Sequence, residues 1–291
     1  MPAPTNRIIN MIIWIASYPK SGNTYLRSFL ASYYYTDNGK FDFDHLIKIH
    51  QFPNIKLSKF KPETKEEASK NWIFNQNNFF EKNKLNLVKT HNCLYPFKGN
   101  KFTSTNETLG AIYIVRDPRN IITSMTHHYS LDYKKALAYM LDEDCSLLEK
   151  SHEQDHSNFT YLNSWSNHYR SWKNNKDFET LFIKYEDIKK DKEETFNKII
   201  LFVNRLMKKN FNIDEKKLLN SIKSTNFSNL KNKELNEGFE ESVYSNKTGK
   251  KINFFNLGFN NRWQKLLPPD IKNEVNQKFR ENLKELNYPN E

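Results

Sequence analysis

The 291-residue sequence has little glycine and little cysteine, with seven and two residues respectively. Cys93 and Cys145 are too few for a disulfide framework and lack metal-site spacing, which fits a reducing, cytosolic setting. Neither the G-x-G-x-x-G dinucleotide fingerprint nor the G-x-x-x-x-G-K-[ST] triphosphate loop occurs. These absences argue against the standard dinucleotide-binding and triphosphate-binding loops.

A long apolar run is also missing. The start of the chain, "MPAPTNRIINMIIWIAS", resembles a short signal peptide with Arg7 before the apolar residues, but the run is too short to span a bilayer. Cleavage there would remove the run "MIIWIA" (11–16), so we expect a cytoplasmic protein without a stable membrane anchor. Met1 and Met11 both stay possible as the native start.

The charge balance is positive, with a formal net charge of +11. Such a balance suggests nucleic acid, an anionic membrane, or a phosphorylated or sulfated small molecule as partner, or simply a lysine-rich surface. The lysines are scattered and form no dense basic block, which argues against a nucleic-acid tail. Hydrophobic residues make up 37% of the chain, enough for one globular domain over 1–291.

Short apolar runs alternate with helix-like stretches along the chain. Strands are predicted over 11–16, 85–90, 109–117 and 179–187, with helices over 24–35, over 119–130 and up to about 203. This alternation predicts an α/β fold, a central parallel sheet flanked by helices. Ligands bind beyond the carboxyl ends of such strands, so the residues expected on one rim are Lys20, His91, Arg116 and Tyr185.

The loop "YPKSGNT" (18–24) joins the first strand to the first helix. Gly22 permits a positive φ, Lys20 adds a cation, and a helix N-terminus follows, which together suit an anion. A simple helix-capping turn is the competing interpretation. Lys20 precedes the glycine instead of following it, so an ATP- and magnesium-dependent nucleotide or small-molecule kinase is disfavoured.

Three motifs, "YPKSGNTYLR", "LVKTHN" and "IYIVRDPRNIITS", together resemble the sulfotransferases that use 3'-phosphoadenosine 5'-phosphosulfate (PAPS). The resemblance covers most of residues 11–203 and weakens towards 265. It implies the P-loop-nucleotide-kinase-like sulfotransferase fold. It also implies in-line transfer of a sulfuryl group to a hydroxyl or amine, which leaves 3'-phosphoadenosine 5'-phosphate (PAP) and requires no metal.

The resemblance also implies roles for individual residues. Lys20 would contact the oxygen between phosphate and sulfuryl group, His91 would be the catalytic base, and Lys89 would assist near the phosphosulfate. The other residues that the resemblance places against the cofactor are Ser21, Gly22, Asn23 and Thr24 around the 5'-phosphate, Tyr25, Tyr185 and Phe227 around the adenine, and Arg116, Ser124 and Gly258 near the 3'-phosphate.

Several of these roles have structural alternatives. Arg116 could instead pair with Asp117, while Tyr25 and Phe227 could be core residues. His127 and His128 are expected to be surface or packing residues. The family's Arg-Lys pair before Gly258 is absent, and the candidate replacements are Arg262, Lys250 and Lys251.

Two less regular regions complete the prediction. Residues 40–84 are expected to help shape a substrate pocket, and 228–262 to form a mobile, lid-like segment before a final helix at about 268–287.

The acceptor could be a small molecule, a glycan or a lipid-linked group, and a homo-oligomer is possible. The rival functions are the kinase, a basic nucleic-acid-binding module, and a related protein that binds the cofactor without turnover.

Overall fold

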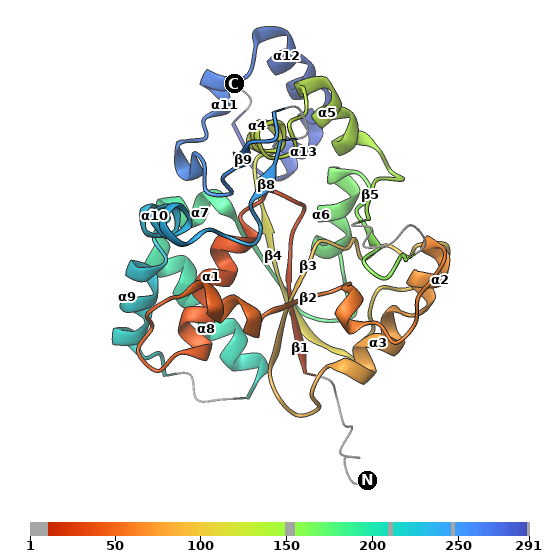
Figure 1. Cartoon of the computed structure of the whole chain (residues 1–291), viewed down its shortest axis with the longest axis vertical. Helices are drawn as coiled ribbons and strands as arrows, with labels where there is room; N and C mark the ends of the chain where they lie inside the picture. The colour runs from red at the N-terminus through yellow and green to blue at the C-terminus, as the bar shows by residue number, and fades with distance from the viewer. Residues whose placement is uncertain (1–10, 149–154, 209–211, 246–247, 290–291) are drawn as a thin grey trace.

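The apolar run after Met11 forms β1 (Ile12–Ala16), the middle strand of a five-stranded sheet in the computed structural model (Figure 1). The structure describes residues 11–148, 155–208, 212–245 and 248–289. All neighbours in the sheet are parallel, in the order β2 (His50–Gln51), β3 (Asn86–Thr90), β1, β4 (Thr108–Val115) and β7 (Thr180–Lys184). The predicted parallel α/β fold is therefore confirmed.

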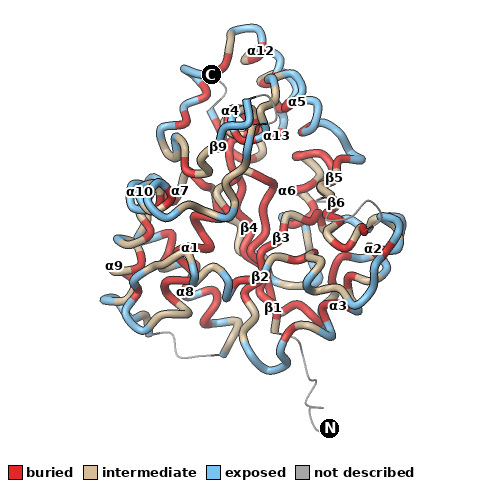
Figure 2. Tube along the Cα trace, viewed as in Figure 1, coloured by how far each residue is buried: buried red, intermediate tan, exposed pale blue. Residues whose placement is uncertain are grey.

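Both faces of the sheet are buried, which explains why β1 reads as an unbroken apolar run. Ile12, Trp14 and Ala16 pack into one hydrophobic cluster, while Ile13 and Ile15 pack into another on the opposite face. Figure 2 shows the buried residues concentrated along the central strands and the exposed ones on the outer sides of the helices. Two helical layers thus hold the sheet rigid between them.

The cluster that contains Ile13 also receives residues from α1 (Asn23–Tyr35), α7 (Tyr185–Lys190), α8 (Lys192–Leu206), α9 (Glu215–Ser224) and α10 (Phe227–Glu237). The cluster that contains Trp14 receives residues from α2 (Lys65–Lys70), α3 (Trp72–Phe79), α4 (Pro118–Tyr129), α5 (Tyr133–Leu141), α6 (Trp165–Lys173), α11 (Trp263–Leu266), α12 (Pro269–Lys278) and α13 (Arg280–Glu285).

The remaining elements are short. They are η1 (Phe43–Lys48), η2 (Ile55–Leu57) and η3 (Gly258–Asn260), with the two-stranded pairs β5 (Ser146–Leu147) with β6 (Thr160–Tyr161) and β8 (Val243–Tyr244) with β9 (Lys251–Ile252).

Three details of the sheet differ from the prediction. The strand expected over 109–117 ends at Val115, so Arg116 and Asp117 lie beyond it. The strand expected over 179–187 ends at Lys184, because the Asp187 carboxylate accepts a hydrogen bond of 3.2 Å from the Lys184 N–H and starts α7 at Tyr185. The edge strand β2 was not predicted, since two residues leave no pattern in a sequence.

The strand order places β1 at a topological switch point. The chain crosses from β1 to β3 on one side and to β4 and β7 on the other, so a crevice is expected beyond the carboxyl end of β1. His91, Arg116 and Tyr185 each follow the last residue of their strand directly.

Within the described ranges no helix is both long and apolar enough to cross a membrane. Met1 and Arg7, which bear on the start of the chain, lie outside those ranges.

Candidate active site

A cavity of about 1320 Å³ lies beyond the carboxyl edge of the sheet. It is lined by residues from the loop after β1, from β3, from α4 and from the segment between α10 and β8. Every residue that the sequence predicted for the site lines this cavity except Ser21, which is fully buried beside it: Lys20, Gly22, Asn23, Thr24, Tyr25, Lys89, His91, Arg116, Ser124, Tyr185, Phe227 and Gly258.

The loop after β1 presents backbone N–H groups to the cavity. Gly22 is the N-cap of α1 with φ 98°, and no side chain caps the helix, so its first-turn N–H groups remain available for an anion. Asn23 ties the loop to the sheet, since its Nδ2 donates to the Ile15 carbonyl at 3.0 Å and to Ser17 Oγ at 3.2 Å. The Ser21 Oγ is buried and has no hydrogen-bond partner among the described residues.

Lys20 extends from the same loop into the cavity. Its Nζ lies 4.2 Å from the centroid of the Phe254 ring. Burial lowers the pKa of Lys20 to about 7, with the nearby cations Arg116 and Lys89 adding to the effect and Glu241 opposing it. A negatively charged ligand beside Lys20 would reverse this shift and favour the charged ammonium.

Arg116 does not form the predicted alternative pair with Asp117. The Asp117 carboxylate instead binds Arg119, with Nη2 at 2.7 Å. The Arg116 guanidinium donates to the carbonyl of Lys20 at 3.0 Å and more weakly to that of Gly258 at 3.4 Å, and in the described part of the chain its Nε has no hydrogen-bond partner. These contacts fix the guanidinium at the cavity wall and leave it able to bind an anion.

His91 is held in one tautomer by the end of β1. Its Nδ1 lies 2.7 Å from the Ser17 carbonyl oxygen, which can only accept, so Nδ1 carries the proton and Nε2 keeps its lone pair. Burial lowers the pKa of His91 to about 3, and Lys89 contributes further. The imidazole is therefore neutral near pH 7 and its Nε2 can accept a proton.

A second histidine fixes the backbone of His91. His168 Nε2 lies 2.9 Å from the His91 carbonyl oxygen, and its Nδ1 lies 2.8 Å from the Tyr113 hydroxyl. Burial lowers the pKa of His168 to about 4, so a neutral ring donates to the carbonyl and accepts from Tyr113. The sequence alone gave no sign of this support, because the three residues are far apart in the chain.

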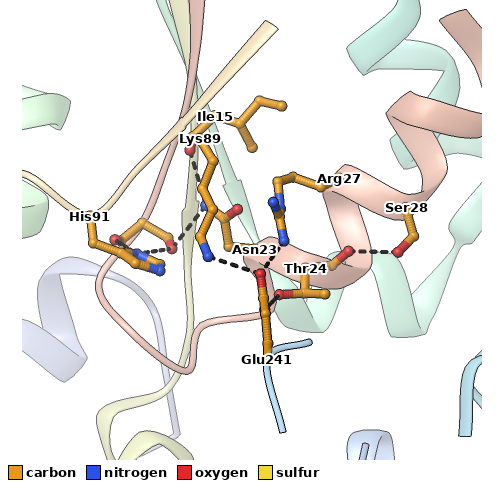
Figure 3. Close-up of polar contacts among 9 residues, drawn as sticks. Ile15, Asn23, Thr24, Arg27, Ser28, Lys89, His91 and Glu241 are labelled. Carbon is orange, nitrogen blue, oxygen red and sulfur yellow. Dashed lines mark hydrogen bonds and ion pairs between the residues drawn. The ribbon is translucent and has the colours of Figure 1, made fainter. Parts of the chain in front are cut away.

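Glu241 and Arg27 are two further site residues that the sequence analysis missed (Figure 3). The Glu241 carboxylate accepts hydrogen bonds from Thr24 Oγ1 at 2.7 Å and Lys89 Nζ at 3.1 Å, and forms an ion pair with Arg27. Burial raises the pKa of Glu241, but Lys89 and Arg27 outweigh it and hold the pKa far below its usual range. Arg27 could have been predicted, since it lies one turn after Thr24 on the same helix face.

Aromatic rings form the side of the cavity near Gly22 and Gly258. The Tyr185 ring lies against Gly22 and under the Arg116 guanidinium, 4.5 Å from ring centroid to Cζ. Phe227 packs against Gly258, where a Cβ would lie 2.5 Å from the ring. Tyr25 is almost fully buried, with its ring edge-on to Phe259 at 5.8 Å.

The helix α4 contributes more to the cavity than predicted. Ser124 lines it as expected. His127 is exposed and His128 packs against Phe254, as expected for surface and packing residues, and both also line the cavity. His128 is 7% exposed, and burial followed by Lys20 lowers its pKa to about 3. It lies one turn after Ser124, so both face the same cavity.

The Arg-Lys pair that is absent before Gly258 has three candidate replacements, and the structure shows which of them line a cavity. Asn256 and Leu257 line the main cavity, whereas Arg262 lines an adjoining one of about 450 Å³ that shares Arg116, Tyr185 and Gly258. Lys250 and Lys251 line neither cavity. Of the three candidates, Arg262 is therefore the one that lines a cavity together with Arg116. No group of three or more potential metal ligands occurs among the described residues.

Comparison with known families and proteins gives matches over most of the chain. The family described as "Sulfotransferase domain" matches residues 11–287. An amine sulfotransferase of Oryctolagus cuniculus is 24% identical over 184 residues, which are 62% of this chain and 56% of the relative. The match thus spans little more than half the length of that curated relative.

Solved structures with the same fold cover nearly all of the chain. Mouse sulfotransferase SULT7A1, crystallised with PAP, has a TM-score of 0.56 and 20% identity over 94% of this chain and 85% of its own. Retinol dehydratase, crystallised with retinol and PAP, has a TM-score of 0.59 and 17% identity over 95% and 82%. The same enzyme was also crystallised with androsterone and PAP, with a TM-score of 0.57 and the same identity and coverage.

Replacement of Gly22 by alanine is expected to destabilise the fold more than the same change at Gly99. Both have φ above +80°, but a Cβ at Gly22 would lie 2.4 Å from the Tyr185 ring, whereas none of the described atoms lies within 4 Å of one at Gly99. Urea unfolding should give a loss of about 1–2 kcal/mol for Gly99→Ala and a clearly larger one for Gly22→Ala. Equal losses would mean that the Tyr185 contact does not constrain the loop.

Proposed function

Because the chain belongs to the sulfotransferase domain family, we propose that it transfers a sulfuryl group from PAPS to a hydroxyl or amine of an acceptor, with His91 as the base. The observation that carries this proposal is the convergence of Lys20, Lys89, His91 and Arg116 on one cavity at the carboxyl edge of the sheet. Three are basic side chains suited to a nucleotide with anionic groups at both ends, and the fourth is a neutral imidazole.

The donor atoms of the site suit the two ends of PAPS. The first-turn N–H groups of α1 would bind the 5'-phosphate, with Lys20 beside them, as would the Ser21 Oγ, which has no partner in the part of the chain that the structure describes. Arg116, whose Nε has no hydrogen-bond partner among the described residues, and Ser124 would bind the 3'-phosphate. Tyr25, Tyr185 and Phe227 would contact the adenine, with Gly258 leaving room beside Phe227.

PAPS supplies an activated sulfuryl group joined to its 5'-phosphate. The His91 Nε2 would accept the proton of the acceptor hydroxyl or amine as that atom forms its bond to sulfur. Lys20 Nζ would donate to the bridging oxygen, which leaves with the phosphate of PAP as the sulfur–oxygen bond breaks. Lys89 would neutralise charge on the sulfuryl oxygens. The chain's own cations and N–H groups therefore suffice without a metal.

The acceptor side of the cavity is partly apolar. Phe43, Leu46, Ile47 and Leu57 line it, from the region 40–84 that was expected to shape a substrate pocket. Retinol and androsterone are bound by the retinol dehydratase structures, and we propose a small molecule with an apolar body and a hydroxyl or amine. We place the activity in the cytoplasm, where the free cysteines Cys93 and Cys145 stay reduced.

Replacement of His91 by alanine is expected to lower sulfate transfer about 10²- to 10⁴-fold, since a positioned base is lost. Transfer is measured with ³⁵S-labelled PAPS and an extract of the native organism, followed by identification of the labelled product. PAP affinity should stay within about twofold of wild type, as His91 does not hold the nucleotide. His156→Ala is the matched control, because His156 does not line the cavity. Unchanged transfer in His91→Ala would exclude His91 as the base.

PAP binding is expected to take up a proton at pH 8. The pKa of Lys20 is about 7 in the unliganded protein, so the side chain is mostly neutral at pH 8, and a phosphate beside it raises that pKa. Calorimetry in buffers of different ionisation enthalpy should give an uptake of up to about one proton, and affinity should fall as the pH rises above 7. Lys20→Met should lose this uptake; the same uptake in both proteins would contradict the assignment.

A further inference from the structure

The Glu241 carboxylate occupies a pocket made of three donors from two distant parts of the chain. Thr24 and Arg27 belong to α1, and Lys89 belongs to β3 (Figure 3). Arg27 and Lys89 are buried, with side chains 6% and 7% exposed, whereas the Glu241 side chain is 26% exposed. The donors thus form the floor of a pocket, and the carboxylate enters it from the cavity side.

Arg27 is a buried cation that forms an ion pair with the Glu241 carboxylate. A buried charge without a counter-charge is strongly destabilising. The Arg27 Nε already has no hydrogen-bond partner in the described part of the chain, so its Glu241 contact is the main compensation there. If Glu241 leaves the pocket, an anion that enters it would restore this compensation.

Two of these three donors lie where the proposed function places the phosphosulfate. Thr24 lies in the loop that would bind the 5'-phosphate, and Lys89 lies where the sulfuryl group would be. The Thr24 Oγ1 donates its single proton to Glu241 at 2.7 Å, so it cannot donate to a phosphate at the same time. Two anions in this small pocket would also repel each other.

We propose that Thr24, Arg27 and Lys89 form a subsite for the phosphosulfate group, and that Glu241 fills this subsite until the cofactor displaces it. This inference rests on the proposed function. It adds Arg27 as a residue that binds the cofactor, and it makes the Glu241 carboxylate an internal competitor of the cofactor. Cofactor affinity is then lower than the donors alone would give, because the Glu241 contacts must be broken first.

Isothermal titration of PAP into wild type and Glu241→Gln tests this exchange. The variant removes the competing charge, so PAP should bind about tenfold more tightly. Glu240→Gln is the matched control, since Glu240 is exposed, lines the same cavity and changes the net charge equally. Adenosine 3'-monophosphate, which has no 5'-phosphate, is the matched ligand, and its affinity should not change.

The contribution of Arg27 is tested in the same background. In Glu241→Gln, the further change Arg27→Gln should weaken PAP binding about tenfold, because a charged donor to the phosphate is lost. Thermal melting establishes that each variant is folded. If Glu241→Gln does not fold, Glu241→Asp is the second variant. Its carboxylate keeps the charge, but its side chain is one methylene too short to reach all three donors. It should therefore also bind PAP more tightly than wild type.

Other outcomes separate the inference from the function on which it rests. If PAP binds wild type but Glu241→Gln binds it equally or more weakly, Glu241 is not displaced and the inference is wrong, while the proposed function stands. If no variant binds PAP, the proposed function is wrong, and inorganic phosphate becomes the probe. Tighter phosphate binding by Glu241→Gln would then still support the subsite, and unchanged binding would reject it.

Discussion

The site depends on one electrostatic constraint: cationic side chains gathered at a buried edge of the sheet require a negative partner. Lys20, Arg27, Lys89 and Arg116 reach this edge from four positions in the chain, and the Glu241 carboxylate contacts two of them. Burial, with added repulsion from Arg116 and Lys89, lowers the pKa of Lys20 to about 7. Such a site favours an anionic ligand, because the charge of the ligand reduces the free-energy cost of burying these cations close together.

The parallel sheet explains how these groups come together. Because all five strands of the central sheet run in the same direction, their carboxyl ends share one edge, and His91, Arg116 and Tyr185 are each the first residue after a strand. Rigid strands thus set the separation of the imidazole, the guanidinium and the tyrosine ring, and hydrogen bonds to backbone carbonyls then orient the first two. The Ser17 carbonyl selects the tautomer of His91, and the Lys20 carbonyl fixes the guanidinium of Arg116.

The parts of the site that depend on local sequence could be predicted. The loop around Gly22 and the residues after β3 and β4 are read from short motifs, and the hydrophobic runs give the sheet. Contacts between distant segments could not be predicted. Glu241 belongs to a polar stretch without a pattern, and only the fold brings it to Arg27 and Lys89. The end of β7 was placed too late because the cap from Asp187 was not recognised.

In the proposed complex the loop around Gly22 and the Arg116 guanidinium hold opposite ends of one nucleotide, and a crystal structure with PAP bound tests this most directly. We expect the 5'-phosphate on the first-turn N–H groups of α1, the 3'-phosphate on Arg116 and Ser124, and the Glu241 carboxylate outside its present pocket. PAP bound elsewhere, or bound in this cavity with neither phosphate on Arg116, would contradict the account.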